Sequence, residues 1–246
     1  MQIGLIGAGN MGAALARGLG ESVLASDSGS GRAQALVDEL GGERLTDNAE
    51  LAKRADLLIL AHKPYQLDAV AAEAAPHTTR VLSLLGGTSL QQLRAAYPDA
   101  LVTHAEPNTP VAHGQGVLAL AVDDGPVDDE VRELLTRAGT VVEVPDGLSG
   151  TAGAISGVGP AYLALVAEAW IEAGIRHGLK PAMATQLVVE TMAGTATLLR
   201  ENGGDTLAAR RAVTSPGGST ARGLAALERE GVRRAFAAAM DDVVNR

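Results

Sequence analysis

The sequence has no cysteine among its 246 residues, which excludes disulfide bonds, thiolate metal sites and a cysteine nucleophile. Aromatic residues make up only 2% of the chain, so its core must be built mainly from Ala, Val and Leu. Small side chains of this kind favour close packing of helices. They are compatible with a large interface between subunits.

Basic residues are few, and they are not clustered. Lys and Arg total 20 against 29 Asp and Glu, a formal net charge of −9, so we expect no nucleic-acid partner. No apolar run approaches the roughly 18 residues that a membrane span requires. The N-terminus also lacks a basic segment followed by a signal cleavage pattern. We therefore expect a soluble, cytoplasmic protein with no membrane contact.

The first part of the chain alternates short apolar runs with helical patterns. The strand candidates are residues 2–6, 23–27, 56–61, 80–85, 100–104, 116–122 and 140–144. Their continuously apolar character is typical of a sheet covered on both faces. Helical segments between the runs indicate βαβ units and a mainly parallel sheet.

From Leu148 onward the strand pattern stops, and apolar residues recur at helical spacing. Pro160 and Pro181 stand at expected first-turn positions, where a missing N–H costs little. The sequence thus predicts an α/β domain over residues 1–147 and an all-helical domain over residues 148–246. Because the C-terminal helices are apolar on more than one face, we expect them to pair with a second subunit.

The stretch GLIGAGNMG places Gly7, Gly9 and Gly12 in a G-x-G-x-x-G pattern between a strand and a helix. In this context the first glycine allows a tight turn, the second a close approach to a pyrophosphate, and the third close packing of helix on strand. The backbone N–H groups of Asn10 and Met11 would face phosphates at the helix N-terminus. The pattern predicts a dinucleotide-binding Rossmann domain.

The end of the second strand carries conflicting signals about the cofactor. Asp27 favours the free ribose diol of NAD. Ser26, Ser28, Ser30 and Arg32 provide groups able to hold the 2′-phosphate of NADP, although a solvated polar loop is an alternative interpretation. We favour NADP (NADPH) and keep NAD (NADH) as the alternative.

Two further residues stand where a Rossmann domain contacts its ligand. Asn48 is placed either to reach the adenosine side or to cap the following helix. Lys63, in the stretch LAHKP, follows the third strand candidate at the carboxyl edge of the sheet, where ligands bind.

A second anion site is indicated near the C-terminus, in the stretch AVTSPGGSTARGLAALE. Gly217 and Gly218 permit an open turn, and Ser219 is a candidate N-cap. The helix from Thr220 onward would present free N–H groups to a carboxylate. Hydroxyl groups there belong to Thr214, Ser215 and Thr220. An ordinary capped turn is the alternative.

With these motifs in view, the chain resembles the pyrroline-5-carboxylate reductase family. VTSPGGSTARGLAALE, ISGVGPAY, EPNTP, LAHKP and GAGNMG are similar to the family's markers and stand in the same order. The resemblance covers essentially the whole chain. It implies a Rossmann domain, an all-helical dimerisation domain, and hydride transfer from NAD(P)H to the C=N bond of pyrroline-5-carboxylate, giving L-proline.

The resemblance also implies roles for individual residues. Gly86 and Gly87 would lie near the nicotinamide. The substrate carboxylate would meet the N–H groups of Gly218, Ser219 and Thr220, and the Thr220 hydroxyl would reach the ring nitrogen. The remaining implied contacts are Ile6, Gly7, Ala8, Gly9, Asn10, Met11, Asn48, Ala61, His62, Lys63 and Pro64 for the cofactor, and Ser215 for the substrate. The glycine motif and the second strand add Gly12 and Asp27 to the expected cofactor contacts, and the C-terminal turn adds Gly217 to the expected substrate contacts.

The implied chemistry needs no metal and no strong nucleophile. The protein must orient the ring, neutralise its carboxylate and hydrogen-bond its nitrogen. Thr220 is the candidate for the last contact, either by positioning the imine or by relaying a proton.

The sequence departs from the family pattern at His104 and Glu106, where members usually carry Arg and Met. His104 is either a pH-sensitive residue of the site or a packed strand end, and we favour the second interpretation. The substitutions keep two alternatives open, a reductase of a related cyclic imine and a dinucleotide-binding sensor without turnover. A β-hydroxyacid-dehydrogenase-like enzyme would depend on a lysine in the helical domain, and Lys180 is the one available.

Overall fold

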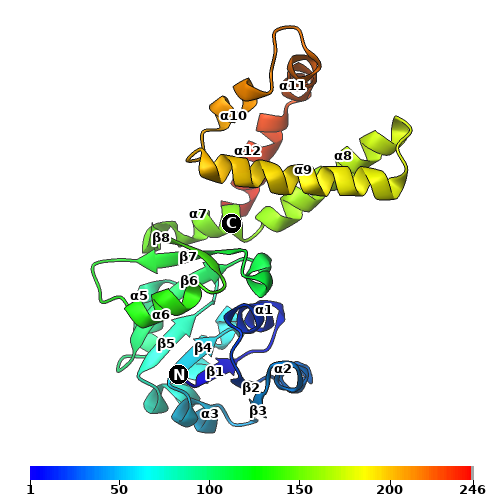
Figure 1. Cartoon of the computed structure of the whole chain (residues 1–246). Helices are drawn as coiled ribbons and strands as arrows, with labels where there is room; N and C mark the ends of the chain where they lie inside the picture. Colours follow the sequence, from blue (N-terminus) through cyan, green and yellow to red (C-terminus); the bar gives the residue numbers. More distant parts are fainter. Residues whose placement is uncertain (245–246) are drawn as a thin grey trace. The chain divides into compact units, whose positions relative to one another are not determined.

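The computed structural model describes residues 1–244. The N-terminal part of this range forms an eight-stranded sheet in the order β3-β2-β1-β4-β5-β6-β7-β8 (Figure 1). The strands are β1 (Ile3–Ile6), β2 (Val23–Ser26), β3 (Gly42–Arg44), β4 (Leu57–Leu60), β5 (Arg80–Ser83), β6 (Leu101–Pro107), β7 (Gly116–Val122) and β8 (Gly139–Pro145).

The helices of the described range fall into two sets. Those that accompany the sheet are α1 (Asn10–Leu19), α2 (Arg32–Leu40), α3 (Asn48–Arg54), α4 (Leu67–Ala74), α5 (Leu90–Ala96), α6 (Asp129–Leu135) and α7 (Ser149–Ser156). Those that follow are α8 (Gly159–Arg176), α9 (Pro181–Glu201), α10 (Thr206–Ala212), α11 (Ser219–Arg229) and α12 (Val232–Val244). Short 3₁₀ turns are η1 (Pro64–Gln66), η2 (Ala75–His77), η3 (Thr109–His113) and η4 (Asp146–Leu148).

Both faces of the sheet are covered, as the continuously apolar strands predicted. Successive strand side chains point to opposite faces, so Leu57 and Ile59 join one core with residues of α1, α2 and α6. Leu58 and Leu60 join the other core with residues of α3, α4 and α5. Residues of both faces are therefore buried along the same strand, which is why its sequence shows no alternation.

The predicted mainly parallel sheet is confirmed, with one antiparallel pair. β6 and β7 run antiparallel, and the other neighbouring strands are parallel. The order reverses between β1 and β4, which places a ligand crevice at the carboxyl ends of these strands. The prediction missed β3 because its sequence, Gly42–Arg44, has no apolar side chain.

The chain divides into two compact units, Met1–Pro160 and Ala161–Arg246. The sequence-based boundary, between residues 147 and 148, lies earlier. The difference arises from α7, which contacts β6, β7 and β8 and is tied to the first unit where the Asn108 side-chain amide donates to the Ser156 carbonyl at 3.2 Å.

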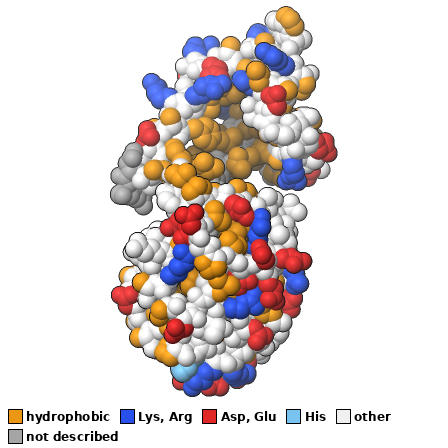
Figure 2. All heavy atoms as spheres, turned by 90° about the vertical axis from the view of Figure 1, so that its left-hand side faces the viewer, with side chains coloured by type: hydrophobic (Ala, Val, Ile, Leu, Met, Phe, Trp, Pro, Cys, Tyr) orange, Lys and Arg blue, Asp and Glu red, His pale blue; other side chains and the backbone are white. Residues whose placement is uncertain are grey.

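The predicted all-helical character of the C-terminal region is confirmed, and its helices leave much apolar surface exposed. Leu165 is 64% exposed and Trp170 is 50% exposed, and α8 contains no buried residue. Figure 2 shows hydrophobic side chains gathered on the visible face of this unit. Surface of this extent in a monomer marks an interaction site.

One helical run in the described chain, Asp146–Arg176, is long and apolar enough to cross a membrane by length and composition alone. Its most apolar window has a mean hydropathy of 1.4 and is 6% buried. This corrects the expectation that no apolar run approaches that length. Ala, Val, Leu and Ile together with few charges raise the average, and a single run of this kind is weak evidence for a membrane helix.

Candidate functional site

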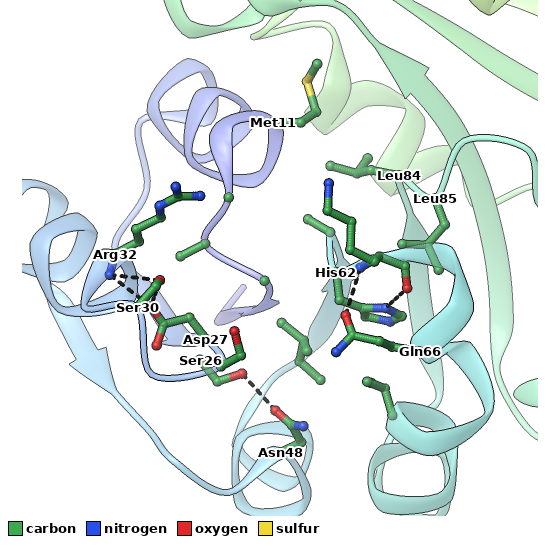
Figure 3. Close-up of a pocket in the computed structure, with 18 of the residues that line it drawn as sticks. Met11, Ser26, Asp27, Ser30, Arg32, Asn48, His62, Gln66, Leu84 and Leu85 are labelled. Carbon is green, nitrogen blue, oxygen red and sulfur yellow. Dashed lines mark hydrogen bonds between the residues drawn. The ribbon is translucent and has the colours of Figure 1, made fainter.

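A cavity of about 800 Å³ lies at the carboxyl ends of β1, β2, β4 and β5 (Figure 3). The sequence-predicted residues that line it are Ile6, Gly7, Ala8, Gly9, Asn10, Met11, Asp27, Asn48, Ala61, His62, Lys63, Pro64 and Gly86. Gly12 and Gly87 were predicted but are not among its lining residues. Residues far apart in the sequence thus meet at one edge of the sheet.

The glycine motif shapes the floor of this cavity. Gly7 has a φ of +103°, and a Cβ there would lie 2.5 Å from the His62 nitrogen. A Cβ on Gly12 would lie 2.9 Å from the Cβ of Ala61. A Cβ on Gly9, in contrast, would meet no protein atom within 4 Å. Gly7 and Gly12 therefore allow close packing, whereas Gly9 leaves open space for a ligand.

Helix α1 begins at this turn with Gly9 as its N-cap and without a side-chain cap. The first N–H groups of a helix have no partner within it. Those of Asn10 and Met11, which both line the cavity, are therefore free to bind an anion.

The Asp27 carboxylate is engaged by its own loop. It accepts the Ser30 hydroxyl at 2.6 Å and the backbone N–H groups of Arg32 at 2.9 Å and Ala33 at 3.2 Å. The Ser30 hydrogen bond is the main reason that the pKa of Asp27 is lowered. Asp27 therefore supports the first turn of α2, and its acceptor capacity is largely used within the protein.

Arg32 remains as the positive charge on this side of the cavity. Figure 3 shows its guanidinium pointing away from the Asp27 carboxylate. It forms no salt bridge with a carboxylate in residues 1–244. Ser28 and Ser30 line the cavity beside it. Because the Ser30 hydroxyl already donates its proton to Asp27, the donors suited to a phosphate here are the Arg32 guanidinium and the Ser28 hydroxyl.

Asn48 is not the helix cap that one interpretation of the sequence offered. Asp47 caps α3 by accepting the N–H groups of Ala49 and Glu50. The Asn48 carboxamide instead accepts the Ser26 hydroxyl at 2.7 Å and donates to Glu73 at 2.8 Å. Asn48 is thereby fixed at the cavity wall.

The stretch after β4 brings His62 and Lys63 to the cavity. The His62 Nδ1 lies 2.9 Å from the Lys63 carbonyl, and burial lowers the pKa of His62 despite this hydrogen bond. The Lys63 N–H donates to the Gln66 side chain at 3.1 Å. Lys63 is exposed and makes no salt bridge within the described chain.

In the second unit, the predicted anion site lies at the start of α11. Gly217 adopts the expected left-handed conformation, with φ of +68°. Ser219 is not the N-cap: the helix begins at Ser219, Gly218 is the N-cap, and no side chain caps the helix. The first-turn N–H groups of Ser219 and Thr220 are therefore free of a capping side chain.

Two expected ligand contacts at this turn are already satisfied by the protein. The Gly218 N–H donates to the Ser215 carbonyl at 3.0 Å, and the Thr214 hydroxyl donates to the Arg210 carbonyl at 2.6 Å. The Thr220 hydroxyl, in contrast, forms no hydrogen bond with residues 1–244. Among the described residues, the hydroxyls of Ser215, Ser219 and Thr220 thus remain available to a ligand, whereas that of Thr214 does not.

Asn108 is a buried polar residue that links β6 to β7 and α7, a role that the sequence analysis did not predict. Its side-chain oxygen accepts the Val117 N–H at 2.9 Å, and its amide reaches the last residue of α7. It follows Pro107 at the end of β6, where its place in the EPNTP motif was the available signal.

Comparison with known proteins agrees with this geometry. A family model for pyrroline-5-carboxylate reductase dimerisation matches residues 148–246. A model for NADP oxidoreductase, coenzyme F420-dependent, matches residues 2–87. A pyrroline-5-carboxylate reductase from Synechocystis is 37% identical over 254 positions, covering 96% of this chain and 93% of the relative. The chain belongs to the pyrroline-5-carboxylate reductase family.

Solved structures of this family share the fold. The 1-pyrroline-5-carboxylate reductase from Streptococcus pyogenes matches with a TM-score of 0.87 and 29% identity, covering 100% of this chain and 97% of the other. The Plasmodium falciparum pyrroline carboxylate reductase with NADP bound also has a TM-score of 0.87, with 25% identity, covering 100% and 96%. The family predicted from the motifs is confirmed.

Asp27→Ala should destabilise the start of α2. Loss of a capping carboxylate costs about 1–2 kcal/mol of the free energy of unfolding at neutral pH. Because the pKa of Asp27 is lowered in the folded protein, its contribution is present above the unfolded value of about 3.9 and is lost as the pH falls through the folded value. Urea denaturation followed by circular dichroism at several pH values measures this difference.

Asp38→Ala is the matched control in the same helix, since that carboxylate accepts only the Gln34 side chain, at 2.8 Å, among the described residues. Its cost should stay within about 0.5 kcal/mol. Equal destabilisation by the two variants would contradict the capping role of Asp27.

Proposed function

We propose that the protein reduces the C=N bond of pyrroline-5-carboxylate to L-proline with NADPH. The observation that carries the proposal is the presence of two separate anion-binding features in one chain of this family. One is the open glycine turn at α1, and the other is the uncapped start of α11 with its free Thr220 hydroxyl. A dinucleotide accounts for the first, and a small carboxylate for the second.

The first cavity fits a dinucleotide. Its backbone is bare at Gly9, where a side chain would project into open space, and the free N–H groups of Asn10 and Met11 face a negative charge. When bound, the nicotinamide supplies the hydride that the imine carbon accepts. The residues proposed to hold it are Ile6, Gly7, Ala8, Gly9, Asn10, Met11, Gly12, Asp27, Asn48, Ala61, His62, Lys63, Pro64, Gly86 and Gly87.

Arg32 supports NADPH over NADH. Asp27, which would otherwise hold a ribose diol, is occupied by Ser30, Arg32 N–H and Ala33 N–H. The free guanidinium of Arg32 and the hydroxyl of Ser28 suit a 2′-phosphate, whereas the Ser30 hydroxyl donates to Asp27.

The start of α11 is proposed to bind the substrate. Its first-turn N–H groups at Ser219 and Thr220 neutralise the carboxylate, and Ser215, Gly217 and Gly218 shape the turn around it. The Thr220 hydroxyl hydrogen-bonds the ring nitrogen. This contact orients the ring and supports positive charge on nitrogen, which makes the adjacent carbon a better hydride acceptor.

We further propose that residues 148–246 form the dimerisation domain, following the family model over this range. A second copy would cover the exposed apolar side chains of α8 and α9, among them Leu165 and Leu187. The same pairing accounts for the exposed run Asp146–Arg176 without a membrane. We propose a cytoplasmic location for the enzyme.

Purified protein mixed with pyrroline-5-carboxylate and NADPH should consume NADPH and form proline. Thr220→Ala should lower kcat by about a hundredfold, because it removes the group that hydrogen-bonds the nitrogen. NADPH binding, measured by fluorescence titration, should not change. Thr220→Ser keeps the hydroxyl and should retain most of the activity.

Two results would contradict this account in different ways. Unchanged turnover in Thr220→Ala removes Thr220 from the mechanism. No turnover by the wild-type protein, while NADPH still binds, points to a related cyclic imine or to a sensor without activity.

Arg32→Ala should weaken NADPH binding by about tenfold or more, because it removes charged hydrogen bonds to a phosphate. NADH binding should stay within about twofold, because NADH has no such phosphate. Arg54→Ala is the matched control, since Arg54 pairs with Glu43 at 2.6 Å and does not line the cavity. Equal loss of NADPH and NADH affinity in Arg32→Ala would rule out a 2′-phosphate role.

A further inference from the structure

β6 carries two ionisable side chains beside the turn that follows β5. His104 pairs in register with Ser83, the last residue of β5. β6 continues to Pro107, so its end runs alongside the residues that leave β5. His104 and Glu106 are two positions apart and therefore point to the same face of the sheet.

His104 is a fully buried side chain with an unsatisfied nitrogen. It is 0% exposed, and its Nδ1 lies 3.2 Å from the Ser83 carbonyl. Its Nε2 has no hydrogen-bond partner in the described chain, and the nearest carboxylate oxygen, Glu106 Oε1, is 3.9 Å away. Buried polar atoms are normally paired. The unpaired Nε2 close to the Glu106 carboxylate therefore suggests that the two side chains act together.

The Glu106 carboxylate lies among three neighbours. The backbone N–H of Gly87 is near enough to favour the charged form of the carboxyl and so to lower its pKa, although the two groups form no full hydrogen bond in the described chain. His104 Nε2 lies 3.9 Å from Glu106 Oε1, and α7 approaches the carboxylate at Gly153. A Cβ on Gly153 would collide with Glu106 Oε2 and would lie 3.3 Å from Cδ. Helix α7 thus has a glycine at the point where this carboxylate rests.

The turn next to this carboxylate, Gly86–Gly87, makes few other contacts that would fix its conformation. Gly86 lines the cofactor cavity, and Gly87 has a φ of +75°. A Cβ on either glycine would meet no atom within 4 Å, so no side-chain packing fixes the pair. The turn closes through the Thr88 N–H, which donates to the Leu85 carbonyl at 3.2 Å.

We propose that Glu106 is a positioning residue for the reaction: its carboxylate, backed by His104, braces the Gly86–Gly87 turn of the cofactor cavity against α7. The bracing acts through the Gly87 N–H and holds the cavity wall in the shape that turnover requires. This inference rests on the proposed function, and it concerns the same site.

The charge of Glu106 decides how strongly the turn is held. Burial raises the pKa of the Glu106 carboxyl, and the facing Gly87 N–H opposes that rise by favouring the charged form. Burial likewise lowers the pKa of His104, which the Ser83 carbonyl and the Asp146 carboxylate oppose. A charged acceptor binds an N–H more strongly than a neutral one. The brace therefore weakens as the pH falls through the raised pKa of Glu106.

Glu106→Ala removes the acceptor and should lower kcat by about tenfold, with KM for the imine within about twofold because no substrate contact is lost. Glu106→Gln keeps an acceptor oxygen and should lose less. The decisive readout is the ratio of kcat for Glu106→Gln to kcat for the wild type across pH. Titration of the substrate cancels in this ratio.

The ratio should rise as the pH falls toward and below the raised pKa of Glu106, because only the wild type loses a charge there. In the control Glu133→Gln, which changes an exposed carboxylate on α6, the ratio to wild type should stay flat. A flat ratio for Glu106→Gln would overturn the proposal.

Gly153→Ala tests the same brace from the helix. Its methyl group displaces the Glu106 carboxylate, so kcat should fall about as far as in Glu106→Ala. In the Glu106→Ala background the added methyl has no carboxylate to displace, and it should change kcat by less than about twofold. If the double variant instead lost kcat by the product of the two single losses, the substitutions would act independently, and the proposed role of Glu106 would be wrong.

Hydrogen exchange separates this proposal from the proposed function. Amide exchange at residues 86–88 of the full-length protein should be about tenfold faster in Glu106→Ala than in wild type. Unchanged exchange overturns the brace even if the protein reduces the imine. Faster exchange in a protein that reduces no imine keeps the brace and rejects the proposed function.

Discussion

The close approach of the β1–α1 turn to the end of β4 is the constraint on which the cofactor cavity depends. A Cβ on Gly7 would lie 2.5 Å from the carbonyl carbon of Ala61, so the two segments pack backbone against backbone. Gly12 allows the first turn of α1 to approach the same place. With α1 held there, its N-terminus opens into the cavity at Gly9. The free N–H groups, the Asp27 loop and the His62–Lys63 segment are then arranged around one point.

The sequence was sufficient to predict much of this arrangement, because it rests on local rules. A glycine with positive φ, a strand before it and a helix after it define a Rossmann turn within a few residues. Because parallel strands all end at the same edge of a sheet, the sequence also predicted that Asn48 and Lys63 would line one site there. The continuously apolar strands likewise indicated a sheet covered on both faces.

Other features depend on contacts between distant residues, and these the sequence did not reveal. Asp27 can hold a ribose or cap a helix, and the loop geometry that engages it with Ser30 cannot be read from spacing. Ser219 is a good N-cap by type, but the chain enters α11 one residue earlier, at Gly218. β3 forms without an apolar side chain because it adds to the edge of an existing sheet.

The C-terminal helices pose a different problem. Their apolar periodicity predicted helices correctly, but a single chain does not contain the surface that buries them. Leu165, Trp170 and Leu187 are half-exposed or more, and the family model over residues 148–246 is one of dimerisation. The average hydropathy of the run Asp146–Arg176, high enough for a membrane helix, is what an apolar dimerisation surface would also produce.

The most direct test of this account compares Gly9→Ala with Gly12→Ala in NADPH titrations and in urea denaturation. Gly9 has a φ of −72° and open space around an added Cβ, so Gly9→Ala should keep the wild-type stability and weaken NADPH binding by about tenfold or more. Gly12→Ala should lower both, because its methyl group meets the Ala61 side chain. NADPH binding of wild-type strength by a stable Gly9→Ala protein would contradict the claim that this turn forms the cofactor site.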